Sequence, residues 1–117
     1  MQPVNDKQWG LKSKLWLELE GHPVIGEGRM AMLRAIDRYG SILQASREIG
    51  ISYRKIRGAI RDMENVVGRP LVISYRGGGE GGGASLTTDA VELMDSYERL
   101  AKGFQNEIDI RFQRLFG

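Results

Sequence analysis

Three arginines on one side of a predicted helix are the residues of this chain whose types and spacing point most directly to chemistry. Arg54, Arg57 and Arg61 lie three and four residues apart, so a helix that turns by about 100° per residue gathers their guanidinium groups on one face. Each guanidinium presents paired donors that fit phosphate oxygens or the O6 and N7 acceptors of guanine. The segment around them therefore has the chemistry of a nucleic-acid-binding helix.

The other face of the same predicted helix is apolar. Ile56, Ile60, Met63 and Val67 fall in one sector, and burying that sector turns the arginines outward. Ser52 stands at the N-cap position, where its hydroxyl can accept a hydrogen bond from a free backbone amide. The positive end of the helix dipole also favours anions there. We expect phosphates to be bound near this helix start.

Recognition helices contact bases mainly through their N-terminal residues, so we assign Tyr53, Arg54 and Arg57 to the major groove. The predicted contacts on or near the phosphate backbone are Ser41, Ser52, Lys55 and Arg61, and Arg76 is expected on phosphate or in the minor groove. The alternative is a solvated arginine face, which is common on surface helices. Gly58 lies on the same face, where glycine costs about 1 kcal/mol relative to alanine. It indicates a close approach by DNA or by another helix.

The segments before this helix predict how it is positioned. Alternating leucines over residues 11–20 predict a strand, and residues 21–23 a turn. Apolar residues three and four apart predict a helix over 27–39 that stops at Gly40 in a left-handed conformation.

A short second helix is expected directly after Gly40. Ser41 and Gln44 have the spacing of a capping box, and Gly50 ends the segment. Two helices joined by a short turn form a helix-turn-helix unit, whose second helix lies in the major groove.

The third helix is expected to end at residues 66–68, and a glycine-rich hairpin is predicted after it. Residues 71–75 and 84–87 have strand character, and the segment 77–83 between them consists of six glycines and Glu80. We expect a mobile tip that either offers backbone amides rather than positive charge to DNA or becomes ordered only in the complex. The segment lacks the Gly-Lys-Ser/Thr ending of a P-loop and the GxGxxG setting, so it is not a nucleotide-binding loop.

The last predicted helix is longer than a small domain can cover. It begins after an N-cap at residues 87–89 and runs for about 25 to 28 residues toward Phe116. Its apolar residues recur at spacings of four, three, four and four: Leu93, Tyr97, Leu100, Phe104 and Ile108. This periodicity favours dimerisation through a partner helix. Packing against its own domain is the alternative.

Composition limits the remaining possibilities. The 117 residues suit one domain, divided into a tail at 1–10, a DNA-binding domain at 11–87 and a dimerisation helix at 88–117. A net charge of +2 means that DNA affinity must depend on where the charges lie. The absence of cysteine excludes thiolate chemistry. No signal peptide or membrane span is recognisable, so cytoplasmic residence is expected.

No enzymatic site is predicted. His22 is the only histidine, and it has neither a metal-binding cluster nor an evident nucleophile beside it. The acidic residues are spread along helices near lysines and arginines, as solvated pairs are. We therefore expect no catalytic residue, no metal and no cofactor.

The order and spacing of these motifs resemble a known family. Gly40-Ser41-Ile42, Gly50-Ile51-Ser52-Tyr53-Arg54 and the glycine-rich segment closing on Leu86-Thr87 are similar to the N-terminal DNA-binding domain of the molybdate-responsive ModE regulators. The resemblance implies a mainly α-helical winged helix-turn-helix fold with a small β-hairpin wing and a long C-terminal dimerisation helix. It also implies binding to a specific double-stranded DNA operator as a homodimer.

Two departures from the family limit that inference. The full regulators carry oxyanion-binding domains after this one, and this sequence ends at Gly117, so we do not expect it to bind molybdate directly. Lys55 and Arg57 are more basic than their counterparts in familiar members, so the operator sequence does not carry over. The alternatives are a winged-helix module that binds an acidic protein partner, and an oxyanion sensor built from helix N-termini.

Overall fold

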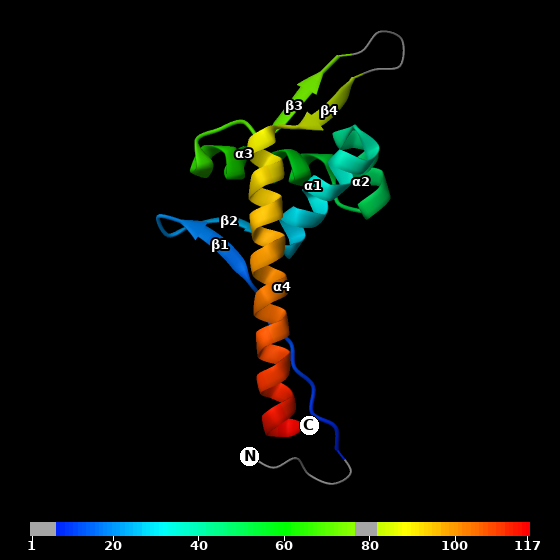
Figure 1. The fold of residues 1–117 in the computed structure, drawn as a ribbon. Helices are drawn as coiled ribbons and strands as arrows, with labels where there is room; N and C mark the ends of the chain where they lie inside the picture. Colours follow the sequence, from blue (N-terminus) through cyan, green and yellow to red (C-terminus); the bar gives the residue numbers. More distant parts are fainter. Residues whose placement is uncertain (1–6, 77–81) are drawn as a thin grey trace.

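The computed structural model describes residues 7–76 and 82–117. It is mainly α-helical, with two small hairpins, as predicted (Figure 1). Three helices and both hairpins form a body, from which the last helix extends (Figure 1). In chain order the elements are β1 (Trp16–Leu19), β2 (His22–Gly26), α1 (Glu27–Tyr39), α2 (Ile42–Ile49), α3 (Tyr53–Val67), β3 (Val72–Tyr75), β4 (Gly83–Leu86) and α4 (Thr88–Phe116).

The core lies between the apolar faces of the helices in the body. Met30, Leu33 and Ile36 of α1 are fully buried, as their spacing predicts. Ile56 and Met63 of α3 are equally buried. These two stripes fix the rotation of each helix about its own axis, because turning either one would expose its apolar side chains to water.

Local capping sets where the helices begin and end. Ser41, Ser52 and Thr87 are the N-caps of α2, α3 and α4, and each side chain accepts a 3.1 Å hydrogen bond from the backbone amide three residues on. Gly40 ends α1 with a φ of 66°, the left-handed value that favours glycine. The predicted capping box of α2 is only half formed: among the described residues the backbone amide of Ser41 does not donate to the side chain of Gln44, whose Nε2 donates to Glu48.

The first hairpin differs from the prediction of one strand followed by a turn. β1 covers only the end of the expected segment, and β2 occupies residues that were expected to break the pattern. The reversal is confined to Glu20 and Gly21, which both have positive φ and therefore form a tight connection. Val24 and Ile25 of β2 are buried at 4% and 1% exposure, so core packing stabilises a strand despite the neighbouring proline.

The second hairpin is the wing. β3 and β4 pair antiparallel, within one residue of the predicted strands, with Tyr75 opposite Gly83. Its base is attached to α3, because the backbone amides of Leu71 and Val72 both donate to one carboxylate oxygen of Glu64, at 2.7 and 3.2 Å. The predicted mobile tip at 77–83 falls mostly outside the described residues, since 77–81 are not described.

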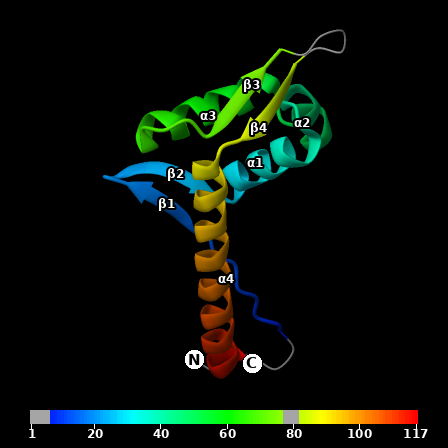
Figure 2. The ribbon, with the colours of Figure 1, turned by 45° about the horizontal axis from the view of Figure 1, so that its top comes forward.

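Helix α4 spans 29 residues, about 43 Å at 1.5 Å per residue. It leads away from the body, and the segment before β1 runs beside it (Figures 1 and 2). Ser13 donates to the side chain of Gln105 at 3.2 Å, and the rings of Trp9 and Phe116 have centroids 5.4 Å apart. Part of the predicted N-terminal tail therefore contacts the far end of α4. Over the described ranges, no helix has the length and apolarity needed to cross a bilayer.

Candidate nucleic-acid interface

The arginine face of α3 points outward. The side chains of Arg54, Arg57 and Arg61 are exposed, whereas Ile56 and Ile60 on the other face are at most 5% exposed. Within the described part of the chain, none of the three guanidinium groups forms an ion pair with a carboxylate. Their charge is therefore available to an external anion such as a DNA phosphate.

The start of α3 combines several of the predicted groups. Tyr53 and Lys55 are exposed beside Arg54, at the end of the helix where the backbone amides are free. The hydroxyl of Ser52 already accepts from the amide of Lys55 at 3.1 Å. It can still donate its own proton, as the hydroxyl of Ser41 can at the start of α2.

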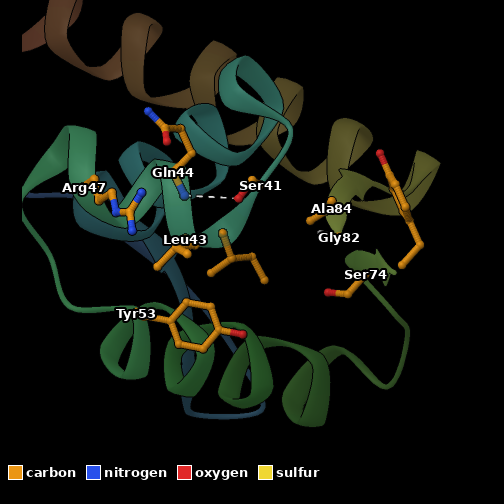
Figure 3. Close-up of a pocket in the computed structure, with 11 residues that line it drawn as sticks. Ser41, Leu43, Gln44, Arg47, Tyr53, Ser74, Gly82 and Ala84 are labelled. Atoms are coloured by element: carbon orange, nitrogen blue, oxygen red, sulfur yellow. Dashed lines mark hydrogen bonds between the residues drawn. The ribbon is translucent and has the colours of Figure 1, made fainter. Parts of the chain in front are cut away.

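A groove of about 590 Å³ separates α2 and the start of α3 from the wing. Figure 3 shows Arg47 and Tyr53 on the helical side and Ser74 and Gly82 on the wing side. Arg47 is exposed but was not among the predicted contacts. The signal that could have identified it is a basic residue in the last turn of the predicted second helix. Arg47 adds a cation to the rim of the same surface.

The wing also contacts the arginine face of α3 directly. Arg57 donates from Nη1 to the hydroxyl of Ser74 on β3, at 3.5 Å. The contact therefore places the Arg57 guanidinium on the wing side of α3. Sequence reasoning did not find Ser74, because pairing between a helix and a strand 17 residues later has no local pattern.

Gly58 has open space where a side chain would be. A Cβ built on it would have no neighbour within 4 Å. Within the described chain no other helix closely approaches this glycine, which contradicts a close approach by a helix of the same chain. The close approach of DNA to the arginine face stays a prediction.

Arg76 is exposed at the end of the β3 strand, where the prediction placed a contact to phosphate or the minor groove. Glu80 and the first glycines of the tip lie outside the described residues. The predicted role of the tip amides in DNA binding therefore stays a prediction.

The long helix carries most of its predicted apolar residues at the surface, but not Tyr97. Its side chain is 1% exposed and its hydroxyl contacts Leu15 and Glu27 of the same chain. Including Tyr97 in a dimer interface was therefore wrong, because its own subunit already covers it. Leu93 is half-buried and packs against the core of its own chain. The seam that α4 leaves at the surface consists of Leu100, Phe104, the half-buried Ile108 and the unpredicted Leu115.

Burial raises the pKa of the Tyr97 hydroxyl above its ordinary value, and the negative charge of Glu27 and its hydrogen bond add to this effect. Tyr97 therefore stays protonated and able to donate at neutral pH. No group of three or more side chains that could hold a metal ion occurs among the described residues.

Relatives of known name are similar over most of this chain. The molybdenum transport protein ModE of Azotobacter vinelandii is 31% identical over 103 residues, 88% of this chain and 38% of the relative. The DNA-binding transcriptional dual regulator ModE of Escherichia coli K12 is 34% identical over 96 residues, which cover 82% of this chain and 37% of the relative. The molybdenum-pterin-binding protein MopB of Rhodobacter capsulatus is 39% identical over 79 residues, which cover 68% of this chain and 29% of the relative. The chain spans about a third of the length of these relatives.

Solved structures share the fold at low sequence identity. The CbnR_DBD-DNA complex aligns with a TM-score of 0.57 at 16% identity, covering 74% of this chain and 94% of that one. The crystal structure of ArgP from Mycobacterium tuberculosis aligns with a TM-score of 0.51 at 19% identity, covering 71% of this chain and 29% of that one. The predicted winged-helix fold is therefore confirmed.

The sequence also matches a family over more than half of its length. Residues 28–91, from the start of α1 to the first turn of α4, match the family described as bacterial regulatory helix-turn-helix protein, lysR family. This range includes both helices of the helix-turn-helix unit and the wing. The predicted resemblance to ModE regulators is confirmed by the relatives named above. The chain belongs to the lysR family of bacterial regulatory helix-turn-helix proteins.

Proposed function

We propose that this chain binds a specific double-stranded DNA site and regulates transcription, in the cytoplasm where the chromosome lies. In this proposal Arg54 and Arg57 of α3 enter the major groove, and the wing flanks the phosphate backbone. The observation that supports it most strongly is the outward arginine face of α3, which lies opposite a buried isoleucine face. None of its three arginines forms an ion pair with a carboxylate of the described residues. Catalysis has no part in this function.

The proposed contacts divide into two groups. Tyr53, Arg54 and Arg57 at the start of α3 read base edges, where paired guanidinium donors match guanine. The backbone group surrounds them and neutralises phosphates: Ser41, Ser52, Lys55, Arg61 and Arg76. Contacts of the second kind strengthen binding to any sequence, so specificity depends on the first group.

We also propose that the protein binds as a homodimer through the seam of α4. Leu100 is 49% exposed and Phe104 is 37% exposed on a helix that extends beyond the body. Covering these side chains with the same residues of a second copy would remove apolar surface from water. Two copies related in this way would place one α3 in each of two successive major grooves of a partly palindromic site.

A link to molybdenum metabolism is proposed from the relatives alone. Three of them carry molybdenum or ModE in their names, and this chain covers only about a third of each. We assign no molybdate site to the described residues.

Selection of bound sequences from random DNA duplexes tests the proposal. We expect an enriched motif made of two related half-sites, and an affinity that falls steeply with increasing salt. Recovery of no motif would contradict sequence-specific binding and favour the alternative of a winged-helix module for an acidic protein partner. A motif with a single half-site would contradict the dimer while leaving the arginine face of α3 in place.

A further inference from the structure

The long helix is attached to the body at very few buried points. Of its 29 residues, only Ala90 and Tyr97 are buried. Other residues of α4 are half-buried against the core: Leu93, Met94 and Ala101. Ala90 and Tyr97 are seven residues apart, about 10 Å along the axis, whereas Phe116 lies about 28 Å beyond Tyr97. A displacement of about 1 Å at Tyr97 would therefore move the end of α4 by about 4 Å, if Ala90 stayed in place.

The hydroxyl of Tyr97 connects three segments that are distant in sequence. It lies 2.8 Å from the carbonyl oxygen of Leu15, just before β1, and 3.2 Å from a carboxylate oxygen of Glu27, the first residue of α1. Both partners are acceptors, so the single phenolic proton is held between them. A tyrosine hydroxyl is protonated at neutral pH, and burial raises the pKa of this one further, so the connection persists there.

The other polar contacts between α4 and α1 or the N-terminal segment are weaker. Arg34 and Glu98 approach to 3.5 Å, but both side chains are about half exposed or more, where ion pairs contribute little. The hydrogen bond from Ser13 to Gln105 is also exposed. Tyr97 is thus the buried polar attachment of α4 to the start of α1.

We propose that the hydroxyl of Tyr97 is a positioning group that fixes the direction of α4 relative to the winged-helix body, and thereby the distance between the two recognition helices of the dimer. The claim about the distance between the two recognition helices rests on the proposed function, whereas the claim about the direction of α4 concerns one chain alone. If two bodies are joined through α4, its angle to each body sets the separation of the two α3 helices. That separation selects which spacing of DNA half-sites can be bound.

Distances between spin labels within one chain test whether Tyr97 fixes the direction of α4. The protein has no cysteine, so Ala31→Cys on α1 and Asn106→Cys on α4 introduce two labels at exposed positions. Dilution with unlabelled protein isolates the distance within one subunit. In Tyr97→Phe we expect the distance distribution to broaden and its mean to shift by about 2 Å, given the position of Asn106 along the helix.

Tyr39→Phe is the matched control, because it removes the same hydroxyl from an exposed tyrosine. Its distance distribution should equal that of the wild type. Circular dichroism checks that both variants fold. A Tyr97→Phe distribution that superimposes on the wild-type distribution in mean and width would overturn the proposal.

Duplexes with two selected half-sites and spacers of varied length test whether Tyr97 sets the distance between the two recognition helices. The wild type should prefer one spacing, and Tyr97→Phe should lose about fivefold of that preference, the factor expected from one hydrogen bond, while binding a single half-site normally. Shifted label distances with an unchanged spacing preference would overturn the link to DNA. If the wild type selects no paired half-sites, the dimer proposal fails, and the label distances still decide the role of Tyr97 in one chain.

Discussion

Arg57 and Ser74 join the recognition helix to the wing, with the guanidinium Nη1 3.5 Å from the serine hydroxyl. The hydroxyl limits the directions in which the guanidinium can point before DNA is bound. Ordering a long side chain in advance reduces the entropy lost on binding.

Removing this hydroxyl should weaken and broaden DNA recognition. We expect Ser74→Ala to lower affinity for the selected site by about fivefold or less, because the contact is long and exposed. Tolerance at one base position should increase. Ser85→Ala on β4 is the control, since Ser85 is exposed on the neighbouring strand. An unchanged base preference in the Ser74 variant would show that Arg57 is ordered without it.

Arginine substitutions on α3 should separate base contacts from phosphate contacts. Arg54→Ala and Arg57→Ala should each cost about 1–3 kcal/mol on the selected site and relax one base position. Arg61→Ala should instead weaken binding to all sequences and reduce the salt dependence by about one counterion. Fluorescence anisotropy at several salt concentrations measures both effects. Arg99→Ala on α4, where Arg99 pairs with Asp95 at 3.6 Å, should change neither.

Charged substitutions in the α4 seam should give monomers. Leu100→Asp with Phe104→Asp places carboxylates where we propose apolar contact between two copies, and burying them unpaired is costly. Sedimentation velocity measures the change in mass. Ile110→Asp is the control, because Ile110 is 53% exposed and lies about 120° around the helix from Phe104. A dimer that survives the double substitution would place the interface elsewhere.

Loss of the α3 cap should destabilise the helix-turn-helix unit. Ser52→Ala leaves the amide of Lys55 without its side-chain acceptor, and we expect a loss of about 1 kcal/mol in the free energy of unfolding. Urea denaturation measures it. Ser96→Ala, in the middle of α4, should be neutral or slightly stabilising because alanine favours helix interiors. Equal stability of the Ser52 variant and the wild type would contradict a structural role of this cap.

The wing base should depend on Glu64. Glu64→Ala leaves the backbone amides of Leu71 and Val72 without their acceptor, which should cost about 1–3 kcal/mol. Glu64→Gln retains one acceptor oxygen and should lose less. Thermal unfolding compares both variants with Glu92→Ala, an exposed site on α4. If Glu64→Ala loses no more than Glu92→Ala, the two amides must be satisfied by water.

The sequence predicted the elements whose limits are set by nearby residues. Ser41, Ser52 and the glycines at 40, 50 and 68 mark helix ends by local hydrogen bonds and left-handed backbone, so α1 and α3 agree with the predicted limits. The outward direction of the arginines also followed from spacing, because one buried face determines the other.

Features that depend on distant contacts were not predictable in this way. β2 contains a proline and follows a glycine, and only the burial of Val24 and Ile25 against the helices makes it a strand. Tyr97 has the spacing of an interface residue, and periodicity does not distinguish a residue covered by its own body from one covered by a partner. The Arg57–Ser74 contact likewise requires the folded arrangement.

The contact between Trp9 and Phe116 has a practical consequence for handling this protein. It places residues near both chain ends at the pole opposite the wing (Figure 1). A fluorescent reporter or surface tether fused after Gly117 would start far from the arginine-bearing surface. Immobilisation through that pole should therefore leave duplexes free access, which makes surface-based binding assays practicable.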